Sequence, residues 1–208
     1  MSKPVVEFVY FTASDAYKAD DSLIDSAVSA VVRAPGSQNL FRGIQTEDGA
    51  TLYIAVAWDS ITSHENLIKN EAEYTPLVSV LQRAIAPSAA MAMLHAEFND
   101  HAAAVRALAD PATELAFFTL KSPDEAAVLP AKMAALEKEL EHAPGRRSYT
   151  WGKVVEKEDQ ILLIIGWDSV EAHWDALKVD KPFADAVASA KESVNIDLVH
   201  VHFQEFKP

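Results

Sequence analysis

The sequence contains no cysteine, which excludes disulfide bonds, thiolate nucleophiles and metal sites built on cysteine. Glycine is also scarce: the 6 glycines are scattered, and none forms a phosphate-binding or dinucleotide-binding loop. No apolar run approaches the roughly 20 residues of a membrane-spanning helix. No secretory leader is visible either, so we expect a cytoplasmic protein without a nucleotide cofactor.

The chain is strongly acidic, with a formal net charge of −13 at pH 7. A field of this sign repels phosphate backbones and anionic lipid surfaces, and the single basic pair at 146–147 is too small to change that. Half of the residues are hydrophobic, which is ample for a core. The composition therefore predicts a globular protein with no nucleic-acid partner and no membrane partner.

A short passage occurs twice in the chain: AWDSITSHE at 57–65 returns as GWDSVEAHW at 166–174. The tryptophans and the histidines of the two copies lie 109 positions apart. Other identities share that offset, namely an Ala-Pro-Gly turn at 34–36 and 143–145, and the pair Gly43 and Gly152. Several identities at one offset indicate two tandem copies of one unit.

The first half of each unit reads as a strand, a helix and the start of a hairpin. In unit one, β-branched and aromatic residues at 5–11 predict the strand. A helix follows, with Ser22 as its expected cap and the Pro-Gly pair at 35–36 as its end. The Asp48-Gly49 pair then predicts a tight turn between two apolar strands.

The second half of each unit reads as a helix and a closing strand. In unit one the helix is expected over about 61–85, with an interruption near Pro76, and the strand over 89–98. Unit two repeats the order, with a first strand at 114–120 and a helix break near 181–182. The predicted boundaries are 1–98 for unit one, 99–113 for a linker with a short helix, and 114–208 for unit two.

Each unit thus has the βαββαβ order of a ferredoxin-like fold. The sheet of such a unit has helices on one face only, so its other face needs cover. We therefore predict an α+β protein in which two tandem ferredoxin-like units pack sheet to sheet, as the two copies in a dimer would.

The hairpin-to-helix passages at 42–67 and 151–177 each place a tryptophan at a strand end, before a serine-capped helix with histidine in its second turn. In this arrangement the chain resembles the dimeric α/β-barrel superfamily, and more closely its antibiotic-biosynthesis-monooxygenase-like branch in a fused, two-domain form. The resemblance covers the whole chain at the level of element order. It implies an intramolecular dimeric α/β barrel.

The resemblance implies a range of activities. Relatives in this superfamily include cofactor-independent oxygenases acting on polycyclic phenols, heme-degrading monooxygenases, polyketide cyclases, and binding or stress-related proteins. In many of them a small hydrophobic ligand lies between the helices and the sheet of one unit. The fold alone does not choose among these activities. The Asn-Trp-His set expected for heme degradation is not evident, although His64 or His173 could serve as an axial ligand.

The repeated tryptophan and histidine are the first candidates for a site. Trp58 and Trp167 end their third strands, where an indole either closes the core or stacks on a ligand. His64 and His173 lie a little over one turn into the next helix, where an imidazole can act as a general base near neutral pH. The alternative for both histidines is a structural role, with the ring hydrogen-bonded to backbone.

The last strand carries His200 and His202, whose side chains leave the same face of a strand. Such a pair can supply two ligands to a metal ion, but a site needs at least a third, and no carboxylate-histidine motif such as HExxH accompanies it. We therefore predict no metal site and expect both histidines to line a polar cavity. His95 lies on the equivalent strand of unit one.

Unit two is richer in aromatic and polar residues around the expected site. Tyr149 and Trp151 share one strand face, and Phe183 occupies the position of Tyr74 in unit one. If a single unit kept a working site, these residues favour unit two, although each could equally belong to the core. The predicted substrate-binding residues are Tyr149, Trp151, Trp167, Trp58, His95, Tyr74 and Phe183.

We therefore predict a small enzyme without a bound cofactor, a monooxygenase or a cyclase, acting on a hydrophobic aromatic or polyketide-like molecule. His173 is the first candidate for the general base, with His200 or His202 assisting and His64 as the counterpart in unit one. The competing hypothesis is a non-catalytic binding or stress-related protein with the same cavity. The tandem arrangement predicts a monomeric pseudo-dimer or a homodimer.

Overall fold

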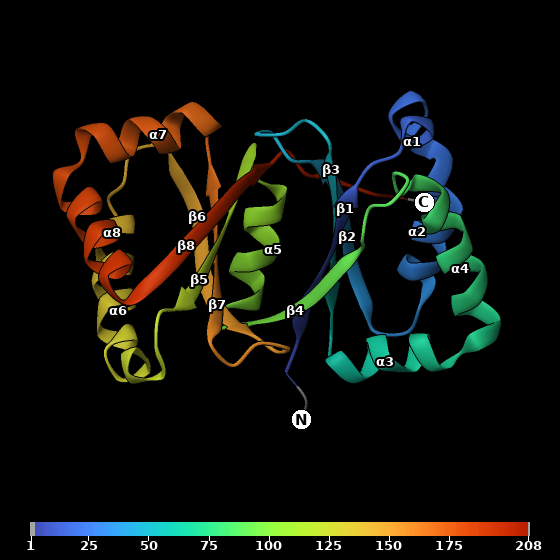
Figure 1. Cartoon of the computed structure of the whole chain (residues 1–208), viewed down its shortest axis with the longest axis horizontal. Helices are drawn as coiled ribbons and strands as arrows, with labels where there is room; N and C mark the ends of the chain where they lie inside the picture. The colour runs from blue at the N-terminus through green and yellow to red at the C-terminus, as the bar shows by residue number, and fades with distance from the viewer. Residues whose placement is uncertain (1–2, 208) are drawn as a thin grey trace.

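The computed structural model describes residues 3–207 and repeats one order of elements twice (Figure 1). Unit one contains β1 (Val5–Thr12), α1 (Asp15–Ala19), the 3₁₀ helix η1 (Asp21–Ile24), α2 (Asp25–Arg33), β2 (Ser37–Ile44), β3 (Thr51–Trp58), α3 (Ile61–Lys69), α4 (Glu71–Ala84) and β4 (Ala92–Phe98). Unit two contains β5 (Ala112–Leu120), η2 (Pro123–Ala127), α6 (Leu129–Leu140), β6 (Arg146–Val154), β7 (Gln160–Trp167), α7 (Val170–Val179), α8 (Lys181–Ser193), β8 (Val194–Val201) and β9 (Gln204–Glu205). The predicted linker holds α5 (His101–Ala109), which confirms the short helix expected there.

All strands belong to one antiparallel sheet in the order β8-β5-β7-β6-β4-β1-β3-β2-β9. The two units join at β4 and β6, where Phe98 lies opposite Gly152. They join again at the far edges, where β9 pairs with β2 and Gln45 bridges to Val201 of β8. The sheet therefore curls and closes on itself, which confirms the predicted α+β fold of two ferredoxin-like units packed sheet to sheet.

Helix α5 lies between the two halves of the curled sheet, with the green helix flanked by strands of both units in Figure 1. Its buried Ala104, Ala107 and Leu108 pack against inward-facing side chains of both units, such as Phe8 of β1 and Ile164 of β7. Each half-sheet thus covers the inner face of the other, with α5 filling the space between them. This is the cover that a one-sided sheet requires.

The outer face of each half-sheet is covered by its own helices, α2 and α4 in unit one and α6 and α8 in unit two (Figure 1). Side chains along β1 alternate between the two layers, with Val5 and Val9 on the helix side and Val6 and Phe8 on the inner side. Glu7 therefore points to the helix side, into an otherwise apolar layer. No helix within residues 3–207 is long and apolar enough to cross a membrane.

The repeated glycines lie where the units meet. A Cβ added to Gly152 of β6 would collide with backbone atoms of Glu97 and Phe98 of β4. A Cβ added to Gly43 of β2 would collide with the backbone of His202 and the side chain of Val201. The two glycines shared at one offset thus permit close approach of a strand to the other unit at both joints.

Two local predictions were wrong. The long helix after Trp58 breaks at Asn70 and not near Pro76, because Asn70 leaves the helical conformation (φ −84°, ψ 79°) and begins a new helix that accommodates the proline. Ser22 does not cap α2 but lies within η1, whose first turn is capped by the Asp20 side chain. The Asp48-Gly49 turn, the serine cap at Ser60 and the break before 181–182 are confirmed.

Candidate functional site

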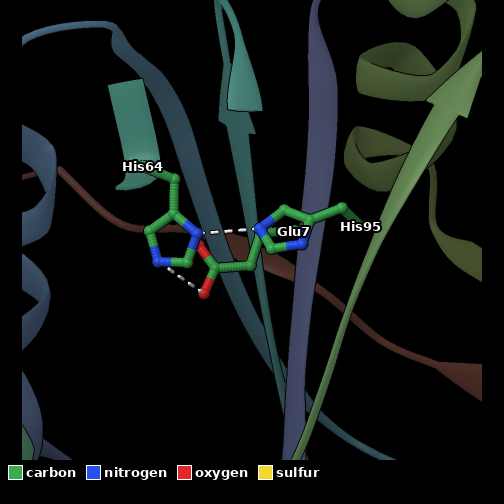
Figure 2. A group of neighbouring side chains, drawn as sticks. All are labelled: Glu7, His64 and His95. Carbon is green, nitrogen blue, oxygen red and sulfur yellow. Dashed lines mark hydrogen bonds and ion pairs between the residues drawn. The ribbon is translucent and has the colours of Figure 1, made fainter. Parts of the chain in front are cut away.

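A series of polar side chains in contact with one another lies between the sheet and helix α3 of unit one. Trp58 at the end of β3 donates its indole N–H to Oε2 of Glu7 on β1, over 2.8 Å. Oε1 of Glu7 lies 3.4 Å from Nε2 of His64 on α3. Nδ1 of His64 lies 2.7 Å from Nε2 of His95 on β4 (Figure 2). Nδ1 of His95 lies 2.5 Å from Oε1 of Glu156, which belongs to unit two.

Local sequence explains how these groups meet. Glu7 and His95 are directly paired across β1 and β4, so their side chains leave the same face of the sheet. The Ser60 side chain caps the start of α3 by accepting the Ser63 backbone N–H, which fixes the first turn of the helix and directs His64 toward that face. The His64 ring stacks on Trp58 at a centroid distance of 5.2 Å.

The three inner members are withdrawn from water, with Glu7, His64 and His95 each 5% exposed or less. Burial raises the pKa of the Glu7 carboxyl above its usual value, although the hydrogen bond from Trp58 opposes the shift. Burial, with a smaller contribution from His95, lowers the pKa of His64 from 6.5 to about 4. Both shifts favour uncharged side chains, as expected where water cannot stabilise charge.

The polar chain borders an apolar cavity of about 230 Å³ in unit one. Glu7, His64 and Trp58 line one part of it, and aliphatic residues from the sheet and from α2 and α4 line most of the rest. Met91 and Met93, which are 41% and 40% exposed, also line it and mark its opening between α4 and the start of β4. The remaining lining residues are Val9, Ala27, Val28, Val31, Leu40, Ile54, Val56, Leu67, Tyr74, Leu77, Val78, Leu81, Gln82 and Ile85.

Unit two contains the equivalent polar side chains. Trp167 donates its indole N–H to Oε2 of Glu114 over 2.8 Å. Nδ1 of His173 lies 2.8 Å from Nε2 of His200, and Nδ1 of His200 lies 2.6 Å from Oε1 of Glu47, which belongs to unit one. Each unit thus supplies the outer glutamate of the other unit's cluster.

The surroundings of the second cluster differ from those of the first. Phe183 is buried against Trp167, with ring centroids 6.2 Å apart, at the position where unit one has the cavity-lining Tyr74. Trp174 stacks on His173 with centroids 4.5 Å apart. The sequence favoured unit two for the site, whereas the structure places an apolar cavity beside His64 of unit one.

The other residues predicted for a site in unit two are placed separately from its histidines. The prediction that His202 shares a strand face with His200 was wrong: β8 ends at Val201, and His202 lies exposed with its ring bonded to the Pro111 carbonyl. Tyr149 and Trp151 face α6, where both donate to Glu137, the tyrosine to the backbone carbonyl and the tryptophan to the carboxylate. Both aromatics are partly buried and pack against the core of unit two.

Four glutamates of the two clusters were missed at the level of sequence, although each left a signal there. Glu7 and Glu114 each interrupt the apolar first strand of their unit, where a carboxylate is unusual, although they lie 107 positions apart and so miss the 109-residue offset by two. Glu47 and Glu156 recur at the same 109-residue offset as the tryptophans, in the hairpin turn. Charged residues in turns are common, so the offset was the informative feature.

The clusters also contain enough ligand types for a metal ion. Glu7, His64 and His95 offer ligand atoms within 4.8 Å of one another, and so do Glu114, His173 and His200. However, two nitrogens that bind one tetrahedral ion at its usual bond length stand roughly 3.3 Å apart. The histidine nitrogens lie 2.7 Å apart in unit one and 2.8 Å apart in unit two, which is a hydrogen-bond distance. The geometry therefore fits hydrogen-bonded pairs.

Comparison with known proteins finds the same fold at low sequence identity. No protein-family model and no curated protein matches the chain. A candidate monooxygenase of Fusobacterium nucleatum is 12% identical with a TM-score of 0.68, and the match covers 100% of this chain and 99% of that one. An anthrone oxidase-like protein is 16% identical with a TM-score of 0.65, covering 97% and 93%.

A candidate chlorite dismutase is 10% identical with a TM-score of 0.65, and the match covers 98% of this chain and 96% of that one. Proteins named for different reactions thus share this architecture over nearly their whole lengths. At such identities the similarity establishes the fold and leaves the reaction to the site. The chain therefore has the dimeric α/β-barrel fold, with both halves of the barrel carried by a single polypeptide.

Proposed function

We propose that the chain is an oxygenase-type enzyme that takes a hydrophobic aromatic or polyketide-like molecule into the cavity of unit one and removes a proton from it. The observation that carries this proposal is the position of Glu7 and His64 beside an apolar cavity of about 230 Å³. Such a cavity suits a small apolar molecule, and the acid–base pair beside it can accept a proton from that molecule.

The volume limits the size of the substrate. A dry protein cavity of roughly 150 Å³ is large enough to bind benzene, so this one has room for two fused rings, or for three if the methionines at its opening move. Met91 and Met93 are flexible side chains that adapt to the shape of a ligand. A planar phenol or anthrone-like molecule fits this description, with its rings among the aliphatic side chains and its polar group beside Glu7 and His64.

The proposed chemistry uses dioxygen as the oxidant and no resident cofactor. Removing a proton from a phenol, or from the CH₂ of an anthrone, leaves an electron-rich anion that can reduce dioxygen directly. For an anthrone, one oxygen atom enters the ring carbon as a carbonyl and the other leaves in water with the two displaced hydrogens. The protein's part is to hold the ring system, exclude water and accept the first proton.

The experiment is to measure dioxygen consumption with anthrone and with a dihydroxynaphthalene as substrates. We expect turnover by the wild type, and a rate about 100-fold lower in Glu7→Gln, because the amide cannot exchange a proton. The matched control is Glu114→Gln, the same change in unit two, which should leave the rate within about twofold. Equal losses in both variants would contradict the assignment of the site to unit one.

A second outcome would favour the binding protein over the enzyme. If naphthol binds the wild type and fails to bind a variant with a filled cavity, Val31→Phe, but dioxygen consumption stays at the background rate, the cavity serves binding without oxidation. A cyclase would instead convert a polyketide-like substrate without using dioxygen, with Glu7→Gln again the inactive variant. The cytoplasmic location and the lack of nucleic-acid partners stay predictions from composition.

A further inference from the structure

The polar side chains of the unit one cluster contact one another in sequence, from Glu7 through His64 and His95 to Glu156. Each imidazole uses one nitrogen toward each neighbour: His64 faces Glu7 with Nε2 and His95 with Nδ1, and His95 faces His64 with Nε2 and Glu156 with Nδ1. In Figure 2 dashed lines join one ring nitrogen of His64 to Glu7 and the other to His95. The series runs from the cavity, which Glu7 and His64 line, to Glu156, whose side chain is 41% exposed.

The outer end fixes which atoms carry hydrogen. The Glu156 carboxylate accepts both the backbone N–H and the ring Nδ1–H of His95. A neutral His95 with its hydrogen on Nδ1 must accept at Nε2, so His64 donates its Nδ1–H there. His64 Nε2 is then left without a hydrogen, and it faces Glu7. The hydrogen bonds of these side chains thus all run in one direction, which leaves His64 Nε2 free to accept a proton at the cavity end.

A proton taken up at this end needs an exit. Burial holds the pKa of His64 at about 4, so its ring is a poor place to keep a positive charge at neutral pH. The transfer is favourable only if the positive charge does not stay on the buried ring. The arrangement of the neighbouring groups provides for this, because each of them can accept a hydrogen on one side while giving one up on the other.

We propose that Glu7, His64, His95 and Glu156 form a proton relay from the cavity of unit one to the surface, and that unit two completes the relay by supplying Glu156. Its use in catalysis rests on the function proposed above. The substrate O–H or C–H bond breaks, the substrate keeps the electron pair, and its proton binds Glu7, which passes its own proton to His64 Nε2.

The later steps move one proton across each contact. His64 gives its Nδ1 proton to His95 Nε2, and His95 gives its Nδ1 proton to Glu156, which releases a proton to water. No ring holds a net charge at the end, and both imidazoles have exchanged tautomers. The reverse series returns a proton to the cavity when the oxygen that leaves as water requires one, and this restores the starting tautomers.

The relay draws on residues of both units. Glu156 lies just after β6 in the hairpin of unit two, and this hairpin also donates the Val155 backbone N–H to the His95 carbonyl. The site of unit one is therefore incomplete without unit two. Unit two lacks the same continuity, because Glu114 Oε2 lies 3.5 Å from Nδ1 of His173, the nitrogen that already faces His200.

The test is to measure, by ¹⁵N-edited NMR of the full chain without substrate, how fast the His64 Nδ1–H exchanges with water. We expect exchange to be about tenfold slower in Glu156→Gln than in the wild type, because the amide can accept a hydrogen bond but cannot accept and release the proton. Glu47→Gln makes the same change at His200 and should leave His64 exchange unchanged.

A purely structural role for Glu156 predicts the opposite sign. Loosening the hairpin would let water in and make His64 exchange faster in Glu156→Gln, and that result, or an unchanged rate, would overturn the relay. Because no substrate is present, such a failure leaves the proposed enzyme untouched. Conversely, slow exchange in Glu156→Gln together with no turnover of any aromatic substrate would keep the relay and reject the proposed function.

Discussion

In unit one the tryptophan, glutamate and histidine chain lies beside an open apolar cavity, whereas in unit two the matching chain is packed against Phe183 and Trp174. The polar groups are the same, and the packing around them differs. The duplicated cluster therefore has a role that both units need, holding α3 or α7 to its sheet and joining the two units through Glu156 and Glu47.

The cavity is the feature that the two units do not share in this form. A chain that carries the same network twice can keep one copy for packing and use the other beside a ligand. Removing the Phe183 ring, or disturbing one network at a time, separates these two roles. The following predictions are ordered by the size of the effect we expect.

The largest effect is expected from Phe183→Ala in unit two. Deleting a fully buried ring next to Trp167 should lower the free energy of unfolding by about 3–5 kcal/mol, as the cavity left behind relaxes only in part. The matched change in unit one, Tyr74→Ala, should cost about 1 kcal/mol, because Tyr74 is half-buried and already borders a cavity. Urea unfolding measures both values.

The same variant also tests the comparison itself. Phe183→Ala should create a space beside His173 similar to the one beside His64, and the variant should bind two naphthol molecules per chain where the wild type binds one. Isothermal titration gives the stoichiometry. A single site in the variant would mean that Trp174 and its neighbours close unit two by themselves.

The next effect concerns pH. The pKa of Glu114 is raised from 4.5 to about 7, mainly by burial, and a hydrogen bond from Trp167 opposes the shift. Between these values the folded chain holds a proton that the unfolded chain has lost, so the free energy of unfolding falls as pH rises. Over this whole pH range the free energy of unfolding falls by up to about 3 kcal/mol because of Glu114.

His173 acts in the opposite direction. Burial lowers its pKa from 6.5 to about 3, so its contribution to stability grows as pH rises toward 6.5. In the wild type the two slopes oppose each other between pH 4.5 and 6.5. In Glu114→Gln the fall in stability that Glu114 causes between pH 4.5 and 7 should disappear, so the variant should gain stability relative to the wild type as pH rises through this range. Glu7, whose pKa burial also raises, is present in both proteins and does not affect this difference. A stability difference that does not change with pH would contradict the assignment to Glu114.

The third prediction concerns the two joints between the units. Gly152→Ala should lower the free energy of unfolding by about 1–3 kcal/mol, because its Cβ would meet backbone atoms of the paired strand β4. Gly43→Ala should cost less, since its neighbours lie at the end of β8 and just beyond it, where the chain can shift. Thermal unfolding of the two variants ranks the joints, and the reverse order would contradict this reading of them.

The smallest effect is expected at the two serine caps. Ser169→Ala should lower the free energy of unfolding by about 1 kcal/mol, because its hydroxyl accepts the Ala172 backbone N–H at the start of α7. Ser60→Ala should cost less, because Ser63 of the first turn of α3 also bonds to Asp59 through its side chain. Unit two has Ala172 in place of Ser63, and Ala172→Ser should narrow the difference.

Much of the fold could be predicted from the chain alone, because it depends on local signals. Alternating apolar strands, the Asp48-Gly49 turn and the caps at Ser60 and Ser169 act over a few residues. The repeat then supplied the one long-range fact, that two similar one-sided sheets share a chain. The errors at Asn70 and Ser22 arose where several polar residues compete to cap adjacent short helices.

The site could be predicted only in part, because it depends on groups far apart in the chain. The repeat singled out His64, His173 and the tryptophans, and the final strands drew attention to His95 and His200. Nothing in the spacing of the residues shows that Glu156, 61 positions from His95, completes the cluster of the other unit. That contact exists because β6 of unit two pairs directly with β4 of unit one, which brings the hairpin after β6 beside His95.

The sequence by itself determined the architecture, the absence of cysteine chemistry and the duplicated Trp-Asp-Ser-x-x-x-His passage. The tertiary structure decided which unit has room for a ligand and which carboxylates face which imidazoles. The physical reason is that secondary structure follows from neighbours in the chain, whereas cavities and buried polar contacts follow from how side chains of distant segments fill the same space.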